Sequence, residues 1–255
     1  MMTVEQAKEI LSGKSCCYAR KFTADDERKA VFLMRVFLGV KNPPIDWYEV
    51  AVRLAYTTFM RTLTGYAKSK NKTGQPKASE YLRNRLENYF KSYTMTSQSG
   101  FDEWHLETCK NLIDKFGTWG VDSKLTYGQA QKWINISFKY LYAFTLFGCC
   151  AKGFPVEIDV SKMEYCYLPL DNIVICSLSQ EEIDKLKKKN TKWKINKKRK
   201  SWTYDGRSWS KLTETDYITI QEDLRKVFGK TRKGQTMLQI DFDIWGGSSV
   251  EDENE

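Results

Sequence analysis

Apolar residues recur at helical spacing along most of the chain. From Ile45 to Tyr66 they mark successive turns, which predicts a long amphipathic helix. A second helix is expected from Ser79, as its N-cap, through Tyr93, and a third runs from Phe101 until Gly117 terminates it. Shorter helices are expected from Glu5 to Leu11 and between Thr23 and Gly39. The pattern therefore predicts a mainly α-helical protein.

The stretch from Leu125 to Phe144 carries a continuous apolar stripe. A turn glycine, Gly128, precedes residues that can start a helix, and Lys132 falls in the expected first turn. A glycine at this place lets the backbone come close to another backbone or to a phosphate, and the free N–H groups of a helix N-terminus bind anions. The stripe itself consists of Trp133, Ile136, Tyr140 and Phe144.

A second stretch, Tyr167 to Ile175, places a single carboxylate before an apolar run. Asp171 follows Pro169 closely and precedes Asn172 to Leu178, so we expect it at the start of a buried element. There it can cap N–H groups or face a cleft. Ser179 and Glu182 have the spacing of a capping box, which predicts another helix start.

The remaining segments are less regular. Leu146 to Met163 contains Gly and Pro and is expected to be irregular. A helix is expected from Thr215 to Val227, ended by Gly229, and Met237 to Trp245 is expected to form a strand or a short packed tail. Alternation of Trp193, Trp202 and Tyr204, with a turn at Asp205–Gly206, predicts a small β hairpin near the C-terminus.

The length of 255 residues permits a core that needs no disulfides. We expect a single domain over residues 1–248, which can also be divided into two lobes, 1–120 and 121–248, with a cleft between them. The acidic tail, residues 249–255, is expected to be disordered. No apolar run approaches the roughly 20 residues of a membrane span, and Met1 to Ile10 is too polar for a secretory signal. A cytoplasmic monomer that does not bind membranes is the expectation.

The chain carries a net charge of +9 and has a pI of about 9.0, which favours attraction to polyanions. Lysines from Lys185 to Lys200 surround Trp193 and Ile195, an arrangement that suits contact with a nucleic-acid backbone. A solvated or disordered lysine run is the alternative interpretation. The expected DNA contacts here are Lys187, Lys188, Lys189, Trp193, Lys197, Lys198 and Arg199.

Seven cysteines without a C-x-x-C pair and one histidine argue against a zinc site or a disulfide framework. We expect reduced, mostly buried thiols, no metal and no cofactor. The single histidine, His105, stands beside Asp102 and Glu103 and could serve as a general acid or base for RNA cleavage. Its helical neighbours Phe101, Cys109 and Leu112 favour a packed face instead.

The turn glycine, the lysine four residues later and the Pro-Leu-Asp run together resemble the helix-hairpin-helix DNA glycosylases of the 8-oxoguanine type. The resemblance implies a multi-helix bundle in which Gly128 matches a hairpin glycine, Lys132 the nucleophile and Asp171 the assisting aspartate. Gln129 and Gln131, beside that glycine, are then expected DNA contacts. The sequence departs from the family at Ala130, at Leu170 and in the longer interval from lysine to aspartate.

That family's chemistry implies an enzyme that flips a damaged or modified base out of duplex DNA and excises it, leaving an abasic site. Lysine-dependent strand cleavage is a further step, and the role is base-excision repair or defence against phage DNA that carries modified bases. Two other classes remain open. One is a non-enzymatic helical nucleic-acid-binding protein of a phage or a defence locus. The other is a ribonuclease toxin that uses His105.

Overall fold

The computed structural model describes residues 46–69, 73–92, 97–120, 123–150 and 158–246. Contacts divide the chain into two compact units, Met1–Ile45 with Ala143–Ile158 and Asp46–Tyr142 with Asp159–Glu255. This division does not coincide with the expected boundary between residues 120 and 121. The expected helices before residue 45 and the acidic tail lie outside the described residues. The second unit contains nearly all of the described residues.

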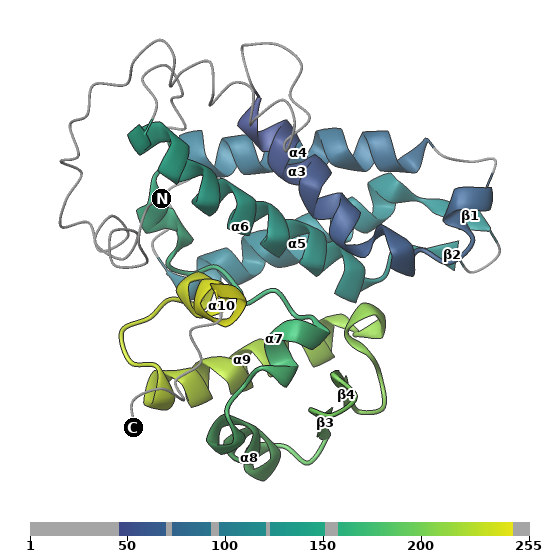
Figure 1. Ribbon diagram of the computed structural model, residues 1–255. Coiled ribbons are helices and arrows are strands. Elements are labelled where there is room, and N and C mark those ends of the chain that lie inside the picture. The colour runs from purple at the N-terminus through teal and green to yellow at the C-terminus, as the bar shows by residue number, and fades with distance from the viewer. Residues whose placement is uncertain (1–45, 70–72, 93–96, 121–122, 151–157, 247–255) are drawn as a thin grey trace, which may run out of the picture. The chain divides into compact units, whose positions relative to one another are not determined.

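Within the described residues the protein is mainly helical, with two small antiparallel strand pairs (Figure 1). The mainly α class and the hairpin near the C-terminus are therefore confirmed. The elements in chain order are α3 (Trp47–Phe59), η1 (Met60–Thr62), η2 (Tyr66–Lys68), α4 (Gly74–Lys91), α5 (Gln98–Phe116), β1 (Thr118–Gly120), β2 (Ser123–Lys124), α6 (Tyr127–Cys150), η3 (Val160–Met163), α7 (Asn172–Cys176), α8 (Gln180–Lys189), β3 (Trp193–Asn196), β4 (Ser201–Tyr204), η4 (Trp209–Lys211), α9 (Glu214–Thr231) and α10 (Met237–Gly246).

The first helices differ from expectation mainly at their ends. Helix α3 ends at Phe59, earlier than expected, because the chain tightens into the 3-10 turn η1. Helix α4 begins at Gly74 rather than after Ser79, and Gly74 lies so close to the end of α5 that a Cβ would meet the Phe116 carbonyl oxygen at 1.7 Å. Gly117 ends α5 as expected, with a φ of 66° that disfavours other residues.

Helix α6 is longer at both ends than the sequence predicts. It begins at Tyr127 and continues to Cys150, through part of the stretch expected to be irregular from Leu146. Lys132 is consequently in the second turn of the helix rather than in the first. Gly128 is the second residue of α6 and does not form a turn before the helix. The β1–β2 pair precedes the helix.

The second half of the unit begins with a short helix, α7, capped by Asp171, and α8, which starts at the predicted capping box of Ser179 and Glu182. Helix α9 continues past Gly229 to Thr231. Of the two alternatives expected from Met237, the strand is wrong, because the segment is helix α10. The segment is nevertheless packed, since Met237, Leu238 and Ile240 are buried. Its start is fixed by hydrogen bonds between Thr236 and Gln239 in both directions, a capping pattern that outweighs the alternation.

The β3–β4 hairpin pairs Trp193 with Tyr204 at its base. Its turn is formed by residues 197–200, not by Asp205–Gly206, which make a second turn after β4. A buried ion pair joins the end of α9 to the start of α8. Arg232, just after α9, donates from Nε to Glu182 Oε1 at 2.7 Å and from its NH2 group to Oε2 at 3.2 Å.

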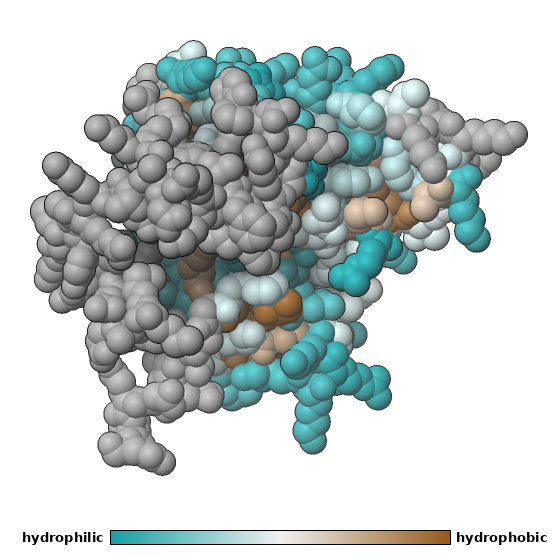
Figure 2. Space-filling model, turned by 45° about the horizontal axis from the view of Figure 1, so that its top comes forward, coloured by the Kyte–Doolittle hydropathy of each residue, from teal (hydrophilic) through white to brown (hydrophobic). Residues whose placement is uncertain are grey.

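Aromatic side chains fill the space among the helices α4, α5 and α6. The Tyr89 ring lies 4.7 Å from Trp104 and 5.2 Å from Phe138, measured between centroids. Hydrophobic residues seen in the middle of the face in Figure 2 are bordered by hydrophilic ones above and below. Among the described residues, the large apolar side chains with the greatest exposure are Met60, Ile173 and Trp245. The aromatic side chains among α4, α5 and α6 therefore belong to the core of the unit.

Candidate functional site

The N-terminus of α6 is docked tightly against η4. Thr126 and Gln129 form reciprocal side-chain to backbone hydrogen bonds that cap the helix, and Thr126 Oγ1 donates to the Ser210 carbonyl at 2.6 Å. A Cβ on Gly128 would lie 2.0 Å from the Trp209 carbonyl oxygen. Glycine is thus required for the approach of one protein backbone to another, and this contact brings the Trp209 indole to the next turn of α6.

Lys132 and Asp171, 39 residues apart, meet at this point. Lys132 Nζ lies 3.4 Å from Asp171 Oδ2, and only 8% and 10% of the two side chains are exposed. The same Nζ lies 4.3 Å from the centroid of the Trp209 ring. An ammonium at this distance interacts favourably with an indole face. The two predicted catalytic residues are therefore neighbours in a nearly dry environment.

Asp171 is held in place by two elements. Its Oδ1 accepts a hydrogen bond from Val174 N at 2.8 Å, which caps α7, and its backbone carbonyl accepts one from Trp202 Nε1 of β4 at 3.0 Å. One carboxylate oxygen thus serves the helix while the other faces Lys132. The interpretation of Asp171 as an N-cap is therefore confirmed, and its second carboxylate oxygen faces the Lys132 amine.

The buried position of Lys132 affects the pKa of its amine. Removal from water lowers the pKa of Lys132, and the nearby Asp171 carboxylate opposes part of that change. The neutral form of a lysine is the nucleophilic one, and a lower pKa increases the share of that form at a given pH. The site thus combines a buried amine of lowered pKa with a carboxylate and an indole face. Sequence reasoning missed Trp209, because nothing in the sequence indicated that η4 would approach α6.

The other residues expected to contact DNA near Gly128 point into the protein. Gln129 is buried, and its Nε2 donates to the Thr62 carbonyl at 3.2 Å. Gln131 is fully buried, donates to the Gly128 carbonyl at 2.7 Å and accepts from Asn135 Nδ2 at 2.9 Å. These side chains stabilise the start of α6 and its packing. In this arrangement they offer almost no surface to a phosphate.

Trp193 lies in the core of the hairpin. It is buried, its ring is 5.5 Å from Trp202 and 5.4 Å from Tyr204, and its Nε1 is 3.4 Å from Asp223 Oδ2. Trp193 thus anchors the first residue of β3, and with 3% of its surface exposed it has almost no ring face free to stack on a base.

The predicted cationic contacts, by contrast, are exposed. Lys197 also donates to the Leu178 carbonyl at 3.0 Å, and Lys189 lies 3.8 Å from Asp223. A hollow of about 470 Å³ lies against the hairpin and the end of α8. It is lined by Lys187, Lys194, Ile195, Asn196, Ser201 and Thr203, and the edges of the nearly buried Trp193 and Trp202 also reach it. We refer to the exposed cations of this region as the basic hairpin surface, which consists of Lys187, Lys188, Lys194, Lys197, Lys198, Arg199 and Lys200.

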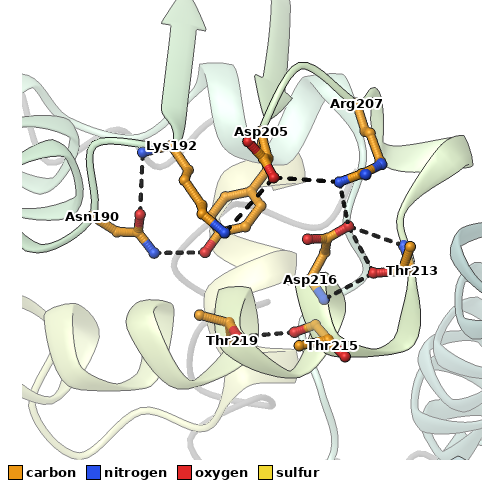
Figure 3. Close-up of polar contacts among 9 residues, drawn as sticks. Asn190, Lys192, Asp205, Arg207, Thr213, Thr215, Asp216 and Thr219 are labelled. Atoms are coloured by element: carbon orange, nitrogen blue, oxygen red, sulfur yellow. Dashed lines mark hydrogen bonds and ion pairs between the residues drawn. The ribbon is translucent and has the colours of Figure 1, made fainter.

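The base of the hairpin is fastened to the start of α9 (Figure 3). Arg207 contacts Asp205 at 3.5 Å and Asp216 at 3.2 Å, and Asp216 belongs to the capping box of α9 together with Thr213. On the other side of the hairpin, Asn190 Nδ2 donates to the Tyr204 hydroxyl at 2.5 Å. The basic hairpin surface is consequently carried on a well-anchored support.

His105 is fully buried between helices. Its Nε2 lies 3.1 Å from Asn135 Oδ1, and its ring stacks on Tyr217 at 5.6 Å with an interplanar angle of 8°. Burial lowers the pKa of His105 to about 3, so the imidazole is neutral at physiological pH. The packed-face interpretation describes this environment, and the ring has no exposed surface for a ribonuclease reaction.

The described part of the chain contains no group of three or more His, Cys, Asp or Glu residues arranged to hold a metal. Cys109, Cys166 and Cys176 are free thiols in buried positions. None of the helices in the described ranges combines the length and apolar character needed to cross a membrane. No protein-family model matches the chain, and no curated protein or solved structure is significantly similar to it.

Proposed function

We propose that the protein is a DNA glycosylase that excises a damaged or modified base, with Lys132 as the nucleophile and Asp171 as its assisting carboxylate. The proposal rests on one observation, the 3.4 Å approach of Lys132 Nζ to Asp171 Oδ2 in a buried setting. These are the two residues that the resemblance to helix-hairpin-helix glycosylases singled out. Asp171 also caps a helix, which fixes its orientation toward the amine.

In the proposed reaction a neutral Lys132 amine attacks C1′ of the flipped nucleotide. The new N–C1′ bond forms as the glycosidic bond breaks, and the departing base takes the bonding electrons and then a proton. One proton of the new C1′ ammonium passes to the departed base. The nitrogen lone pair then forms a C1′=N bond as the C1′–O4′ bond breaks and O4′ takes a proton from solvent, which gives a protonated Schiff base from which strand cleavage can follow. Asp171, as a carboxylate, stabilises the positive charge that develops on the sugar.

Trp209 defines how a substrate would enter. Its ring covers the Lys132 ammonium at 4.3 Å, so an everted nucleoside has to displace the indole from the amine. The freed indole face is of a kind that stacks on bases, with about 1–3 kcal/mol expected for such a contact. If the flipped base replaces the Lys132 ammonium on the Trp209 ring, one favourable contact of the indole is exchanged for another. The new stacking contact then offsets part of the free energy needed to flip the base.

The test uses duplexes that each carry a different modified base, with borohydride added to trap a Schiff base. The wild-type protein is expected to release at least one of these bases and to form a trapped adduct. Lys132→Gln is expected to abolish trapping, and Asp171→Asn is expected to slow base release strongly while its amide oxygen keeps the helix cap. Lys124→Gln, at an exposed lysine shortly before α6, is the matched control and should behave as wild type. Trapping that survives in Lys132→Gln would refute the assignment.

The basic hairpin surface favours a second candidate, a nucleic-acid-binding protein without chemistry. Its cations are exposed and lie on a firmly anchored hairpin beside a shallow hollow. Under this alternative the triple reversal Lys198→Glu, Arg199→Glu and Lys200→Glu weakens DNA binding and its salt dependence, with a decrease of about 0.9 in the log–log slope per lost phosphate contact. Binding that depends on these residues while Lys132→Gln has no effect on any activity would favour this candidate.

A reversal with the same change in charge elsewhere provides the control for that experiment. Lys226, Lys230 and Lys233 are exposed near the end of α9 and outside the basic hairpin surface. If their reversal to glutamate weakens binding as much as reversal at the hairpin, attraction depends on net charge alone and the hairpin is not a specific contact.

A further inference from the structure

The two faces of the β3–β4 hairpin differ in polarity. Successive residues of a strand point to opposite faces, and directly paired residues share a face. One face therefore carries the aromatic side chains that pack in the core, together with Ile195. The outer face is polar and consists of two cross-strand pairs, Lys194 with Thr203 and Asn196 with Ser201. This outer face lines the hollow, where Lys187 from the last turn of α8 joins it.

The hollow carries positive charge that no carboxylate balances. Other lysines of the same segment each form an ion pair with a carboxylate, namely Lys185, Lys189 and Lys192. Lys187 and Lys194 form none with the described residues, and no Asp or Glu lines the hollow. The carbonyls at the end of α8 favour a lysine in its last turn, which accounts for Lys187, but Lys194 belongs to a strand. Two unbalanced ammonium groups at one hollow favour an anionic ligand.

Neutral hydrogen-bond donors complete the lining. The hydroxyls of Ser201 and Thr203 form no hydrogen bond with any of the described residues. Asn196 Oδ1 accepts from Arg199 N at 3.0 Å, and its Nδ2 donates to no other group in the described part of the chain. The oxygens of a phosphodiester only accept, and Lys, Ser, Thr and Asn side chains are common donors to phosphate in protein–DNA interfaces. The chemistry of the lining therefore suits a phosphate group.

The length of the hairpin favours a nucleic-acid strand over a single phosphate. Three further cations of the basic hairpin surface, Lys198, Arg199 and Lys200, lie in the turn beyond Asn196. Two residues at about 3.3 Å each separate Lys194 from Asn196, so the turn begins roughly 7 Å further along the hairpin. Phosphates of one strand of B-DNA follow one another every ~3.4 Å of the helix axis. The hollow and the turn are therefore spaced to contact different phosphates of one strand, which the one phosphate of a mononucleotide cannot do.

We propose that the hollow binds a phosphate group of a DNA strand, with Lys187 and Lys194 as its cationic contacts and Ser201 and Thr203 as its neutral donors. The turn then holds a second phosphate of the same strand. The hollow thus gives the strand a fixed position, whereas the turn alone supplies attraction by charge. That the polymer is DNA rests on the proposed function, but the recognition of phosphate does not.

The test measures binding of a fluorescein-labelled DNA duplex by anisotropy at a series of salt concentrations. The double variant Lys187→Gln, Lys194→Gln is expected to reduce the log–log slope of affinity against salt by about 0.9, the value for one phosphate contact. Lys188→Gln, Lys230→Gln is the matched control. It removes the same charge from exposed lysines that do not line the hollow and form no ion pair with the described residues. Its slope should equal that of the wild type.

A second variant leaves the charge of the hollow unchanged. Ser201→Ala, Thr203→Val is expected to weaken DNA binding at least about threefold with the same salt slope, because it removes hydrogen bonds to a charged group. A surface that attracts DNA by charge alone would not respond to this change. The substituted side chains are at least partly exposed and bond to no described residue, so the variants should fold, as circular dichroism can verify. If a double variant does not fold, Lys187→Gln alone replaces it.

Inorganic phosphate and a 5′-mononucleotide are added as competitors at constant ionic strength. If either displaces the labelled duplex as effectively, per phosphate, as unlabelled duplex does, the hollow is a small-anion site and the proposal is overturned. Equal slopes in the hollow variant and its control would also overturn it. A lower slope in a protein that releases no base would sustain the phosphate site and refute the glycosylase. Base release that requires Lys132, with a slope unaffected by the hollow variant, would do the reverse.

Discussion

Replacement of Gly128 by alanine tests the docking of α6 on η4, on which the geometry of the Lys132 site depends. In the interior of a solvated helix alanine is favoured over glycine by about 1 kcal/mol, so helix propensity alone predicts a more stable protein. The structure predicts the opposite. The new Cβ would lie 2.0 Å from the Trp209 carbonyl oxygen and 3.2 Å from the Ser210 carbonyl carbon, and a backbone group cannot rotate away as a side chain can.

The expected magnitude follows from three contributions. Overpacking of a closely fitted site costs about 1–3 kcal/mol, and a contact with backbone lies at the upper end of that range. Separation of α6 from η4 also weakens the 2.6 Å hydrogen bond from Thr126 to the Ser210 carbonyl, at a cost of about 1 kcal/mol. The gain in helix propensity offsets about 1 kcal/mol. The free energy of unfolding should therefore fall by about 3 kcal/mol.

Urea unfolding, followed by both tryptophan fluorescence and circular dichroism, measures this change. Gly229→Ala is the control, because Gly229 lies in helix α9 on the surface and a Cβ there would meet no atom within 4 Å. The control is expected to gain up to about 1 kcal/mol. A Gly128→Ala protein that unfolds at the same urea concentration as wild type, or at a higher one, would refute the close approach of α6 to η4.

Two further predictions concern residues whose expected functional roles the fold places in doubt. For His105, the pKa of about 3 in the folded state lies below the 6.5 of the unfolded state, so the unfolded chain binds the extra proton between these values and stability falls on acidification by at most about 5 kcal/mol. Urea unfolding at pH 6.5 and pH 4 should show a smaller loss in His105→Gln than in wild type, and equal losses would contradict the burial of a neutral ring. For Trp193, replacement by alanine should lower the free energy of unfolding by about 3–5 kcal/mol, and a stable variant with impaired DNA binding would instead indicate direct contact with nucleic acid.

Helix positions were largely predictable because they follow from local periodicity and from caps that the sequence displays. Ser179 and Glu182 form the expected capping box, and Gly117 ends α5 as predicted. The predicted helix boundaries were wrong where contacts between residues distant in sequence, or a capping pair that was overlooked, decide where a helix begins. Gly74 is at the start of a helix because it packs on Phe116, and the alternation after Met237 is outweighed by the hydrogen bonds of Thr236 and Gln239.

The candidate site was predictable only in part, for a similar reason. Lys132 and Asp171 were identified from short motifs, but their neighbour Trp209 comes from an element whose approach to α6 no local pattern indicates. The burial of Trp193 could not be predicted from the sequence. A tryptophan between lysines gives the same sequence pattern whether its indole is exposed or lies in the core of a hairpin.

The fastening of α9 at both ends has a mechanical consequence. Its first turn is bonded through Asp216 and Arg207 to the base of the hairpin, and Arg232, just beyond its last turn, is bonded to Glu182 at the start of α8. The chain from α8 through the hairpin to α9 is therefore a closed ring rather than an arm with a loose tip. The lysine-bearing turn therefore lies on a segment that is tied to its neighbours on both sides, and its orientation is set by contacts far from it in sequence.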